Sequence, residues 1–364
     1  MTALAILGAP QRYIQGPDAL DQLGTVTREH GRKPFVVADD IVEKLLGGRL
    51  AKNLAEAGCD AVTGRFSGEI TRPEIERLAG MCRAAACDAV IGIGGGKTID
   101  AAKFVKLTLG LPIVVAPSVA SNDAPTSRVI VIYDQHHAIA EILTLKANPE
   151  VVLVDTAVIA RAPARFFAAG IGDALSKKFE AEQGARGGAL NLFKGRPTAT
   201  AVAMGAMCYD AIRRHGLPAM DAVRRGQVTE DLERAVEATI LLSGLSFESG
   251  GLSAAHAMTR GLAACAGTRD ALHGEMVSFG LMVQLVLEGR DDAFLADLRG
   301  FCRAVGLPVS LAGLGLEKPA AEDFRLMAER SMTAAYIKFM TVPVDAQRLE
   351  AAIVRADALG RLLA

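Results

Sequence analysis

Three residues in the second half of the chain, Asp173, His256 and His273, are of the types that bind a divalent metal ion. The two histidines stand in apolar segments of helical periodicity, where an imidazole without a partner is costly to bury. Seventeen residues separate them, a rise of roughly 25 Å along a single helix. The segment CAGTRD at 265–270 is therefore expected to separate two helices. Two imidazoles and a carboxylate would leave zinc an open position, as in catalytic sites, whereas two hydrogen-bonded core histidines are the alternative.

A second set of residues is suited to binding phosphate. The stretch DAVIGIGGGKTID at 88–100 begins as an apolar run typical of a strand, passes through Gly94, Gly95 and Gly96, and continues with helical spacing. A strand, a glycine turn and a helix N-terminus together direct backbone N–H groups at a phosphate. Glycine allows this close approach because it has no Cβ. The same pattern also fits a tight bend between a strand and a helix.

Asp39 and Asp40 follow the apolar run FVVA at 35–38. In a dinucleotide-binding fold, an acidic side chain at the carboxyl end of a strand accepts hydrogen bonds from ribose hydroxyls. Because such a carboxylate repels a 2′-phosphate, it favours NAD over NADP. The acidic residues here precede the glycines instead of following them by about twenty residues, so the usual fingerprint order is not kept. Capping of the next helix is the alternative role.

The elements that must hold these residues follow from the hydrophobic pattern. Apolar runs typical of strands lie at 35–38, 61–66, 90–93, 112–117, 129–133 and 151–155, and helical patterns lie between them. This alternation predicts an α/β domain with a mainly parallel sheet covered on both faces. After Pro163 all periodicity is helical. We therefore expect an α/β domain over 1–162 and an all-helical domain over 163–364.

Composition excludes several other classes of protein. The 364 residues suffice for about two domains. The net charge of -1, without a basic block, disfavours a nucleic-acid partner. No apolar run reaches the roughly 18 residues of a membrane helix, and the N-terminus lacks the basic residues of a signal peptide. Six scattered cysteines without a CxxC pair indicate reduced thiols and a cytoplasmic location.

Five motifs together carry a resemblance to a known family. In chain order they are GIGGGKTIDAAK, SNDAPTSRVIVIY, GIGDAL, FESGGLSAAHA and LHGEMVSFG. Their order and spacing resemble those of the glycerol dehydrogenases, within the iron-containing (group III) alcohol dehydrogenase superfamily. The resemblance extends from RYIQGPDAL near the start to about Ala358. It implies the dehydroquinate synthase-like fold, with an N-terminal NAD-binding α/β domain and an all-helical C-terminal domain that binds metal and substrate.

The resemblance also implies individual roles. Asp173, His256 and His273 match the zinc ligands, and Asp123 matches the ligand of the substrate hydroxyl. The positions that match cofactor-binding residues are Asp39, Gly94, Gly95, Gly96, Lys97, Asp100, Ser118, Ser121, Ser127, Val129 and Tyr133. Zinc would lower the pKa of a bound alcohol, and NAD would accept the hydride. Related enzymes are often octamers, so a homo-oligomer is expected.

Several residues near these motifs depart from the glycerol dehydrogenase pattern. Arg128 replaces a small residue, Lys177 a Thr, Thr259 and Arg260 a His and an Asn, and Lys338 and Phe339 a His-Asn pair. One interpretation is drift on solvated helix faces. The other is a pocket for an anionic substrate, since Arg and Lys bind carboxylate and phosphate strongly. The charge of Lys177 would in addition weaken metal binding by repulsion.

The leading functional prediction is therefore zinc-assisted, NAD-dependent oxidation of a vicinal diol, with glycerol as the default substrate and dihydroxyacetone as its product. One alternative is the same chemistry on an anionic polyol, either a hydroxy acid or a polyol phosphate. Another is a sugar-phosphate cyclase resembling dehydroquinate synthase, although SNDAPTS at 121–127 is of the glycerol dehydrogenase type. A binding protein without catalysis is disfavoured because all three metal-ligand positions are intact.

Overall fold

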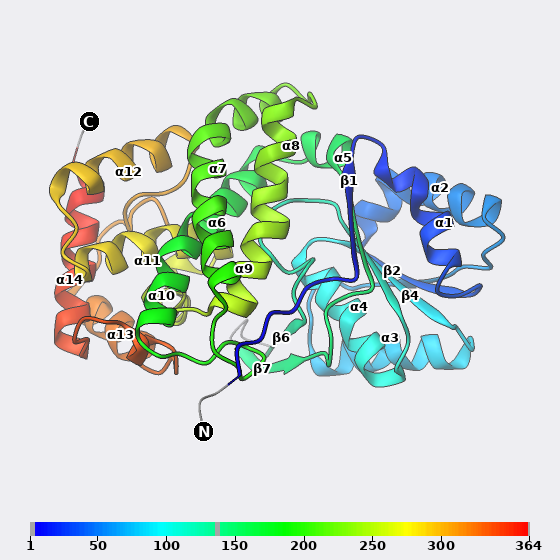
Figure 1. The fold of residues 1–364 in the computed structure, drawn as a ribbon, viewed down its shortest axis with the longest axis horizontal. Helices are drawn as coiled ribbons and strands as arrows, with labels where there is room; N and C mark the ends of the chain where they lie inside the picture. The colour runs from blue at the N-terminus through cyan, green and yellow to red at the C-terminus, as the bar shows by residue number, and fades with distance from the viewer. Residues whose placement is uncertain (1–3, 135–138, 363–364) are drawn as a thin grey trace. The chain divides into compact units, whose positions relative to one another are not determined.

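The computed structural model describes residues 4–134 and 139–362. The chain divides into two compact units. The first, called here the α/β unit, comprises Ala9–Ala162 and Ala222–Val236. The second, called the helical unit, comprises Met1–Gly8, Pro163–Asp221 and Glu237–Ala364. Figure 1 shows the elements of both units along the chain.

The α/β unit is built from short strands that alternate with helices. Its strands are β1 (Arg12–Gly16), β2 (Pro34–Ala38), β3 (Val62–Arg65), β4 (Ala89–Gly94), β5 (Ile113–Pro117), β6 (Val129–Tyr133), β7 (Ile139–Thr144) and β8 (Val151–Asp155). Its helices are η1 (Ala19–Gln22), α1 (Leu23–Arg28), α2 (Asp40–Glu56), α3 (Arg72–Ala84), α4 (Gly96–Leu109), α5 (Thr156–Ala160) and nearly all of α8 (Glu230–Glu237). The alternation is the one predicted from the apolar runs.

The main sheet has six strands in the order β1-β8-β5-β4-β2-β3, and every described pair in it is parallel. The predicted α/β fold with a mainly parallel sheet is thus confirmed. The run at 129–133 forms β6, but β6 lies outside this sheet and pairs antiparallel with β7. The parallel strands place their carboxyl ends at one edge, where the loops that follow β2, β4 and β5 begin.

Side chains alternate between the two faces of the sheet, and both faces are buried. Phe35 and Val37 of β2 belong to a core cluster with Ile75 of α3 and Ile99 of α4. The intervening Val36 belongs to the opposite cluster, together with residues of α1 and α2. Burial on both faces explains why these strands are continuous apolar runs instead of alternating patterns.

The helical unit contains no strand among its described residues. Its helices are α6 (Ala164–Arg186), most of α7 (Ala199–Arg224), η2 (Ala238–Leu242), α9 (Ser243–Gly250), α10 (Ala254–Ala263), η3 (Ala266–Thr268), α11 (His273–Leu287), α12 (Asp292–Ala304), α13 (Ala321–Ser331), η4 (Ile337–Phe339) and α14 (Ala346–Arg361). The all-helical character predicted after Pro163 agrees with this. The predicted break at 265–270 separates α10 from α11 and contains η3.

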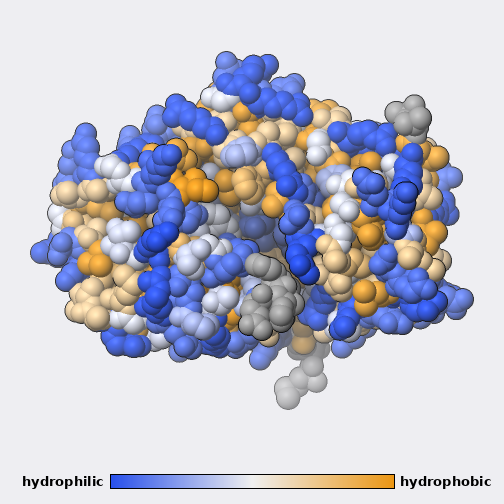
Figure 2. Space-filling model, turned by 180° about the vertical axis from the view of Figure 1, so that it is seen from behind, coloured by the Kyte–Doolittle hydropathy of each residue, from blue (hydrophilic) through white to orange (hydrophobic). Residues whose placement is uncertain are grey.

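No helix within residues 4–134 and 139–362 combines the length and apolar character that a bilayer crossing needs. On the face shown in Figure 2, hydrophilic residues are spread among hydrophobic ones.

Candidate functional site

Three helices of the helical unit bring the predicted metal ligands together. Asp173 lies in the middle of α6, His256 in the first turn of α10, and His273 is the first residue of α11. One ligand atom from each lies within 4.8 Å of the other two. Asp173 and His256 are buried, whereas His273 is exposed. This arrangement resembles a catalytic metal site, in which one side stays open to substrate.

Glycines allow these helices to approach so closely. A Cβ at Gly172 would lie 2.4 Å from the carbonyl oxygen of Gly274, and a Cβ at Gly274 would lie 1.8 Å from that of Ala169. Both separations are shorter than real side chains tolerate. Because Gly172 precedes Asp173 and Gly274 follows His273, contact between α6 and α11 also brings the two functional residues close.

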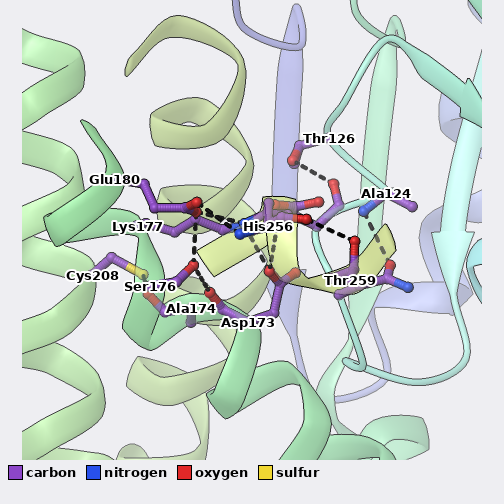
Figure 3. Close-up of polar contacts among 12 residues, drawn as sticks. Ala124, Thr126, Asp173, Ala174, Ser176, Lys177, Glu180, Cys208, His256 and Thr259 are labelled. Carbon is purple, nitrogen blue, oxygen red and sulfur yellow. Dashed lines mark hydrogen bonds and ion pairs between the residues drawn. The ribbon is translucent and has the colours of Figure 1, made fainter. Parts of the chain in front are cut away.

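Lys177 lies beside Asp173 and His256 (Figure 3). It follows Asp173 by one turn of α6, and its side chain is 1% exposed. Its Nζ donates to Asp173 Oδ1 at 2.6 Å and lies 3.3 Å from His256 Nε2. His256 Nε2 is itself 3.3 Å from Asp173 Oδ1. One carboxylate oxygen therefore faces both an ammonium and an imidazole.

Glu180 fixes the position of His256 from the other side. Its Oε1 accepts the backbone N–H groups of Ser253 and His256, both at 2.9 Å, at the start of α10. Its Oε2 lies 2.5 Å from His256 Nδ1. With Nδ1 held by Glu180, Nε2 is the nitrogen that faces Asp173. A carboxylate behind a histidine in this way sets the ring orientation and the tautomer of a metal ligand.

The pKa values of this cluster reflect opposing effects. Burial would raise the pKa of Asp173, but the charge of Lys177 and the hydrogen bond from His256 hold it well below its usual range. Burial would likewise raise the pKa of Glu180, and the neighbouring His256 and Lys177 lower it instead. Burial would lower the pKa of His256, yet Glu180 and Asp173 raise it to about 9. The cluster is therefore held together by charge.

The donor set fits a divalent ion. One carboxylate and two imidazoles are suitable ligands for zinc and for other first-row metals. The second oxygen of Asp173, Oδ2, is buried and has no hydrogen-bond partner among the described residues. Such an atom is costly to bury unless a ligand contacts it. We take this oxygen as an observation in favour of an ion at Asp173, independent of the residue types.

The α/β unit gathers a second set of predicted residues at the carboxyl edge of its sheet. Asp39 follows β2, Gly95 follows β4 and Ser118 follows β5, and these three strands are neighbours. The chain continues from β2 outward to β3, then crosses to β4 on the other side of β2. Ligands of parallel α/β sheets bind outside such a switch point. The edge therefore has the place and composition of a dinucleotide site.

The glycine turn has the form of a phosphate cradle. Gly95 is the N-cap of α4 and no side chain caps this helix, in contrast to α2, α5, α12 and α14, which begin at capping Asp residues. Gly94 has a φ of +154°, and a Cβ there would lie 2.7 Å from the side chain of Thr98. A helix N-terminus with uncapped N–H groups attracts an anion. The side chain of Asn122 lies beside this one, 2.8 Å from where a Cβ of Gly96 would be.

Asp39 performs the capping role that the sequence left open. Its Oδ1 accepts the backbone N–H of Val42 at 2.9 Å, at the start of α2, and its Oδ2 accepts from Thr98 Oγ1 at 3.4 Å. The contact with Thr98 places Asp39 beside the first turn of α4, where the cradle is. Its neighbour Asp40 instead forms an exposed ion pair with Arg65. Of the two, Asp39 is the one adjacent to the glycine turn.

Asp100 and Lys103 form a buried pair that holds the following loop. Lys103 is fully buried, and its Nζ donates to Asp100 Oδ1 at 3.0 Å and to the carbonyl oxygens of Ala124 at 2.6 Å and Val129 at 3.0 Å. Asp100 Oδ2 accepts the backbone N–H of Val131 at 3.0 Å. Asp100 thus holds the segment around 124–131, and its role in cofactor binding stays a prediction.

The other predicted cofactor positions lie on or beside this segment. Ser127 Oγ is 3.5 Å from Lys103 Nζ and accepts the backbone N–H of Val129. Asp123, the predicted substrate ligand, is buried at the start of the same segment. Two of the remaining positions, Ser118 and Ser121, are half-buried.

Lys97 and Tyr133 lie close to each other beside α4. Lys97 forms an ion pair with Glu69 at 2.6 Å, and its Nζ lies 5.5 Å from the centre of the Tyr133 ring. Burial raises the pKa of Tyr133 to about 12. This phenol therefore stays neutral at any physiological pH.

The unusual cations have different surroundings. Arg128 donates to the carbonyl oxygen of Leu145 at 3.0 Å, and Arg260 to that of Thr333 at 3.4 Å. Thr259 donates to the carbonyl oxygen of His256 at 2.7 Å. Lys338 is exposed. Of the four cations, Lys177 alone is a fully buried member of the metal-ligand cluster.

Sequence reasoning missed two residues of this architecture, Glu180 and Lys103. Glu180 lies seven residues after Asp173 and three after Lys177, so helical spacing already placed all three on one face of α6. Lys103 lies three residues after Asp100 in an otherwise apolar stretch. In both cases the available signal was a charged residue on the apolar face of a helix.

Known proteins resemble this chain over almost its whole length. A family model described as iron-containing alcohol dehydrogenase matches residues 10–156. The chain is 40% identical over 358 residues to the glycolaldehyde reductase of Halobacterium salinarum, and the match covers 98% of each chain. It is 40% identical over 361 residues to the glycerol dehydrogenase of Citrobacter freundii, again over 98% of each. A crystal structure of a probable glycerol dehydrogenase from Sinorhizobium meliloti superimposes with a TM-score of 0.92 at 37% identity, covering 98% of this chain and 99% of that one.

The position of Glu180 predicts the effect of neutralising it. In Glu180→Gln, the amide donates to His256 Nδ1 and drives the proton to Nε2, so that Nε2 can no longer accept a metal. We expect metal affinity to fall by roughly 10- to 100-fold, the range for partners behind metal ligands. Glu182→Gln, which alters a surface pair with Arg186 on the same helix, is the control. Equal zinc affinity of the Glu180→Gln variant and wild type, measured by competition with a chelator, would contradict this role.

Proposed function

Because this chain belongs to the iron-containing alcohol dehydrogenase family and is an oxidoreductase that acts on alcohols, we propose that it oxidises a small vicinal diol with NAD. Glycerol, oxidised to dihydroxyacetone, is the first candidate, since the relative from Citrobacter freundii is a glycerol dehydrogenase. The relative from Halobacterium salinarum is named a glycolaldehyde reductase. Reduction of glycolaldehyde yields ethylene glycol, which is also a vicinal diol. The observation that carries the proposal is the meeting of Asp173, His256 and His273 within 4.8 Å.

The family implies NAD and a divalent metal ion, and we propose zinc as the ion. Asp173, His256 and His273 would hold it, and Glu180 would keep Nε2 of His256 turned toward it. When bound, zinc supplies a Lewis acid that lowers the pKa of an alcohol, and NAD supplies the hydride acceptor. The exposed position of His273 supports a site that remains accessible to substrate.

We assign NAD to the carboxyl edge of the sheet in the α/β unit. The uncapped N-terminus of α4 at Gly95 and Gly96 would bind the pyrophosphate, and Asp39 the adenosine ribose. Lys103 would keep the segment that carries Asp123 and Ser127 in place through its bonds to Ala124 and Val129. Asp123 would orient the second hydroxyl of the diol, a positional role. The proposed domain roles are NAD binding for 1–162, and metal and substrate binding for 163–364.

A neutral diol is the preferred substrate over an anionic one. Lys177, the buried member of the four unusual cations, is already paired with Asp173, and Arg128 and Arg260 donate to backbone carbonyls. These contacts favour local structural roles over recognition of a carboxylate or a phosphate. A cyclase of the dehydroquinate synthase type is disfavoured by the glycerol dehydrogenase relatives at 40% identity.

We further propose that the protein acts in the cytoplasm as a homo-oligomer. All six cysteines are free thiols, and five of them are buried. Burial raises the pKa of several, including Cys82 to about 12. Unreactive reduced thiols of this kind suit a reducing compartment. The oligomer is an expectation from the resemblance, and light scattering of the purified protein would measure it.

The main experiment is a substrate panel. NADH formation would be followed by absorbance with added zinc, for glycerol, ethylene glycol, glycerate and glycerol phosphate. We expect glycerol or ethylene glycol to give the highest kcat/KM. A charge-assisted hydrogen bond is worth roughly 1.5–3 kcal/mol. An anionic compound preferred by tenfold or more would therefore indicate recognition by the unusual cations. Oxidation of none of the four would overturn the proposal.

The metal site predicts a separation of two effects. His256→Ala should reduce kcat by at least about 1000-fold because a proposed ligand is removed. It should leave the affinity for NAD within about twofold, because the residues assigned to NAD belong to the α/β unit. His215→Ala, which changes a histidine outside the cluster, is the control. Tryptophan is absent from the chain, so NADH fluorescence on binding gives a clean measure of cofactor affinity.

The carboxylate of Asp39 predicts the cofactor preference. Asp39→Asn keeps a side-chain oxygen to cap α2, since Asn and Asp cap helices about equally well. It removes the charge that would repel a 2′-phosphate. We expect the ratio of kcat/KM for NAD to that for NADP to fall at least tenfold, while Asp40→Asn leaves it unchanged. The assignment is wrong if wild type uses both cofactors equally well.

A further inference from the structure

Lys177 places a positive charge inside the cluster that we assign to the divalent ion. Its side chain is 1% exposed. Its Nζ lies 2.6 Å from Asp173 Oδ1, 3.3 Å from His256 Nε2, and 5.4 Å from the centre of the Phe247 ring. The ammonium thus contacts two of the three side chains that would ligate the ion.

An ion bound to the same two atoms could not lie far from this ammonium. Asp173 Oδ1 and His256 Nε2 are 3.3 Å apart, and zinc lies about 2.1 Å from ligand atoms of these types. Together with the position of Nζ, those distances leave the ion no place more than about 4 Å from the ammonium. Two cations at that separation repel strongly where burial reduces screening by water. Lys177 cannot keep this position while an ion is bound to these two atoms, and an ion bound through Asp173 Oδ2 instead would still be repelled by the ammonium on the other oxygen of the same carboxylate.

Burial makes the displacement of Lys177 costly as well. The ammonium would lose its ion pair with Asp173, and its side chain would have to leave a fully buried place in the core. A buried charge that loses its partner is strongly destabilising unless it reaches water. The binding of an ion must supply this free energy in addition to displacing the ammonium.

The charges of the cluster lead to the same conclusion. Asp173 and Glu180 are fully buried carboxylates that share one face of α6. Glu180 has His256 as its partner, and Asp173 has Lys177. In the glycerol dehydrogenase pattern, position 177 is a threonine, which carries no charge. With a threonine there, Asp173 would need a cation from solution. In this chain the protein provides that cation itself.

We propose that Lys177 acts as an internal cation that occupies the place of the divalent ion in the metal-free protein and must turn away before the ion can bind. The inference rests on the proposed metal site and concerns how the binding of the ion at that site is controlled. The protein holds its ion weakly and exchanges it readily, and the metal-free form stays folded because its buried carboxylates remain paired.

The test is the zinc affinity of variants at position 177. The purified full-length protein would be stripped with a chelator, and zinc would be titrated against a chromophoric competitor. We expect Lys177→Thr and Lys177→Met to bind zinc roughly 10- to 100-fold more tightly than wild type, the size of effect that changes beside metal ligands produce. The Met variant removes the charge and keeps an unbranched side chain that is one atom shorter than that of lysine.

A matched control is available on the same helix. Lys178 is the next residue of α6, and its Nζ lies over the rings of Phe179 and Tyr209 instead of the cluster. Lys178→Thr should leave the zinc affinity within about twofold of wild type. Adding His256→Ala to Lys177→Thr should abolish the gain, which shows that the tighter ion is bound at the predicted ligands. Circular dichroism would check that each variant is folded.

The stability of the metal-free form gives a second measurement. Without zinc, Lys177→Thr and Lys177→Met should have a lower Tm than wild type because Asp173 loses its partner. With saturating zinc, their Tm should rise more than that of wild type, since a ligand that binds more tightly stabilises more.

The outcomes separate this inference from the proposed function. Equal zinc affinities for wild type and both Lys177 variants would overturn the inference, while diol oxidation by wild type would leave the function intact. Tighter zinc in the variants together with no alcohol oxidation would sustain the inference and overturn the function. If neither wild type nor the variants bound zinc, the three residues would not form a zinc site and both proposals would fail.

Discussion

The helical unit depends on charges that α6 carries into its interior. Asp173, Lys177 and Glu180 are at most 1% exposed, and a buried charge persists only where an opposite charge and hydrogen bonds meet it. Glu180 obtains both from the start of α10, where it accepts two backbone N–H groups and faces His256. The requirement to satisfy Glu180 therefore fixes where α10 begins and how His256 is turned. The functional geometry is in this sense a consequence of burying α6.

The α/β unit likewise contains a buried ion pair, which here holds a loop in position. A loop cannot be positioned by strand pairing along its length, so its backbone carbonyls need donors from elsewhere. Lys103 provides them from the buried face of α4, and Asp100 both balances its charge and holds the backbone of β6. The buried ion pairs of α6 and α4 are costly to bury, but each charged group in them has few alternative partners. Buried ion pairs of this kind give a fixed position more than they give stability.

Helices and strands could be predicted from the sequence where their burial produces a regular pattern of apolar residues. Strands such as 151–155 are buried on both faces and appear as continuous apolar runs, and the helices after Pro163 keep their period. The strand β1 was not predicted because RYIQG is half-exposed, without a long apolar run. The sequence also did not predict that Ala222–Val236 belongs to the α/β unit. A helical pattern in a sequence reveals which face is apolar, but not which surface that face packs against. The three candidate metal ligands, which the structure brings together, could be singled out because histidine is rare here. Glu180 and Lys103, in contrast, look like ordinary surface charges in a sequence.

The spacing on α6 explains how chemistry can change in this fold without a change of backbone. Asp173, Lys177 and Glu180 project from one helix face at intervals of four and three residues. The backbone around them is set by other contacts, such as the approach of α6 and α11 at Gly172 and Gly274. A substitution at the middle position therefore alters the charge beside Asp173 while the ligands keep their places. Because charges interact strongly where water is excluded, we infer that one such residue changes how firmly a cation is held. Two proteins can thus share this fold and the same candidate ligand residues and still differ in their affinity for a metal ion.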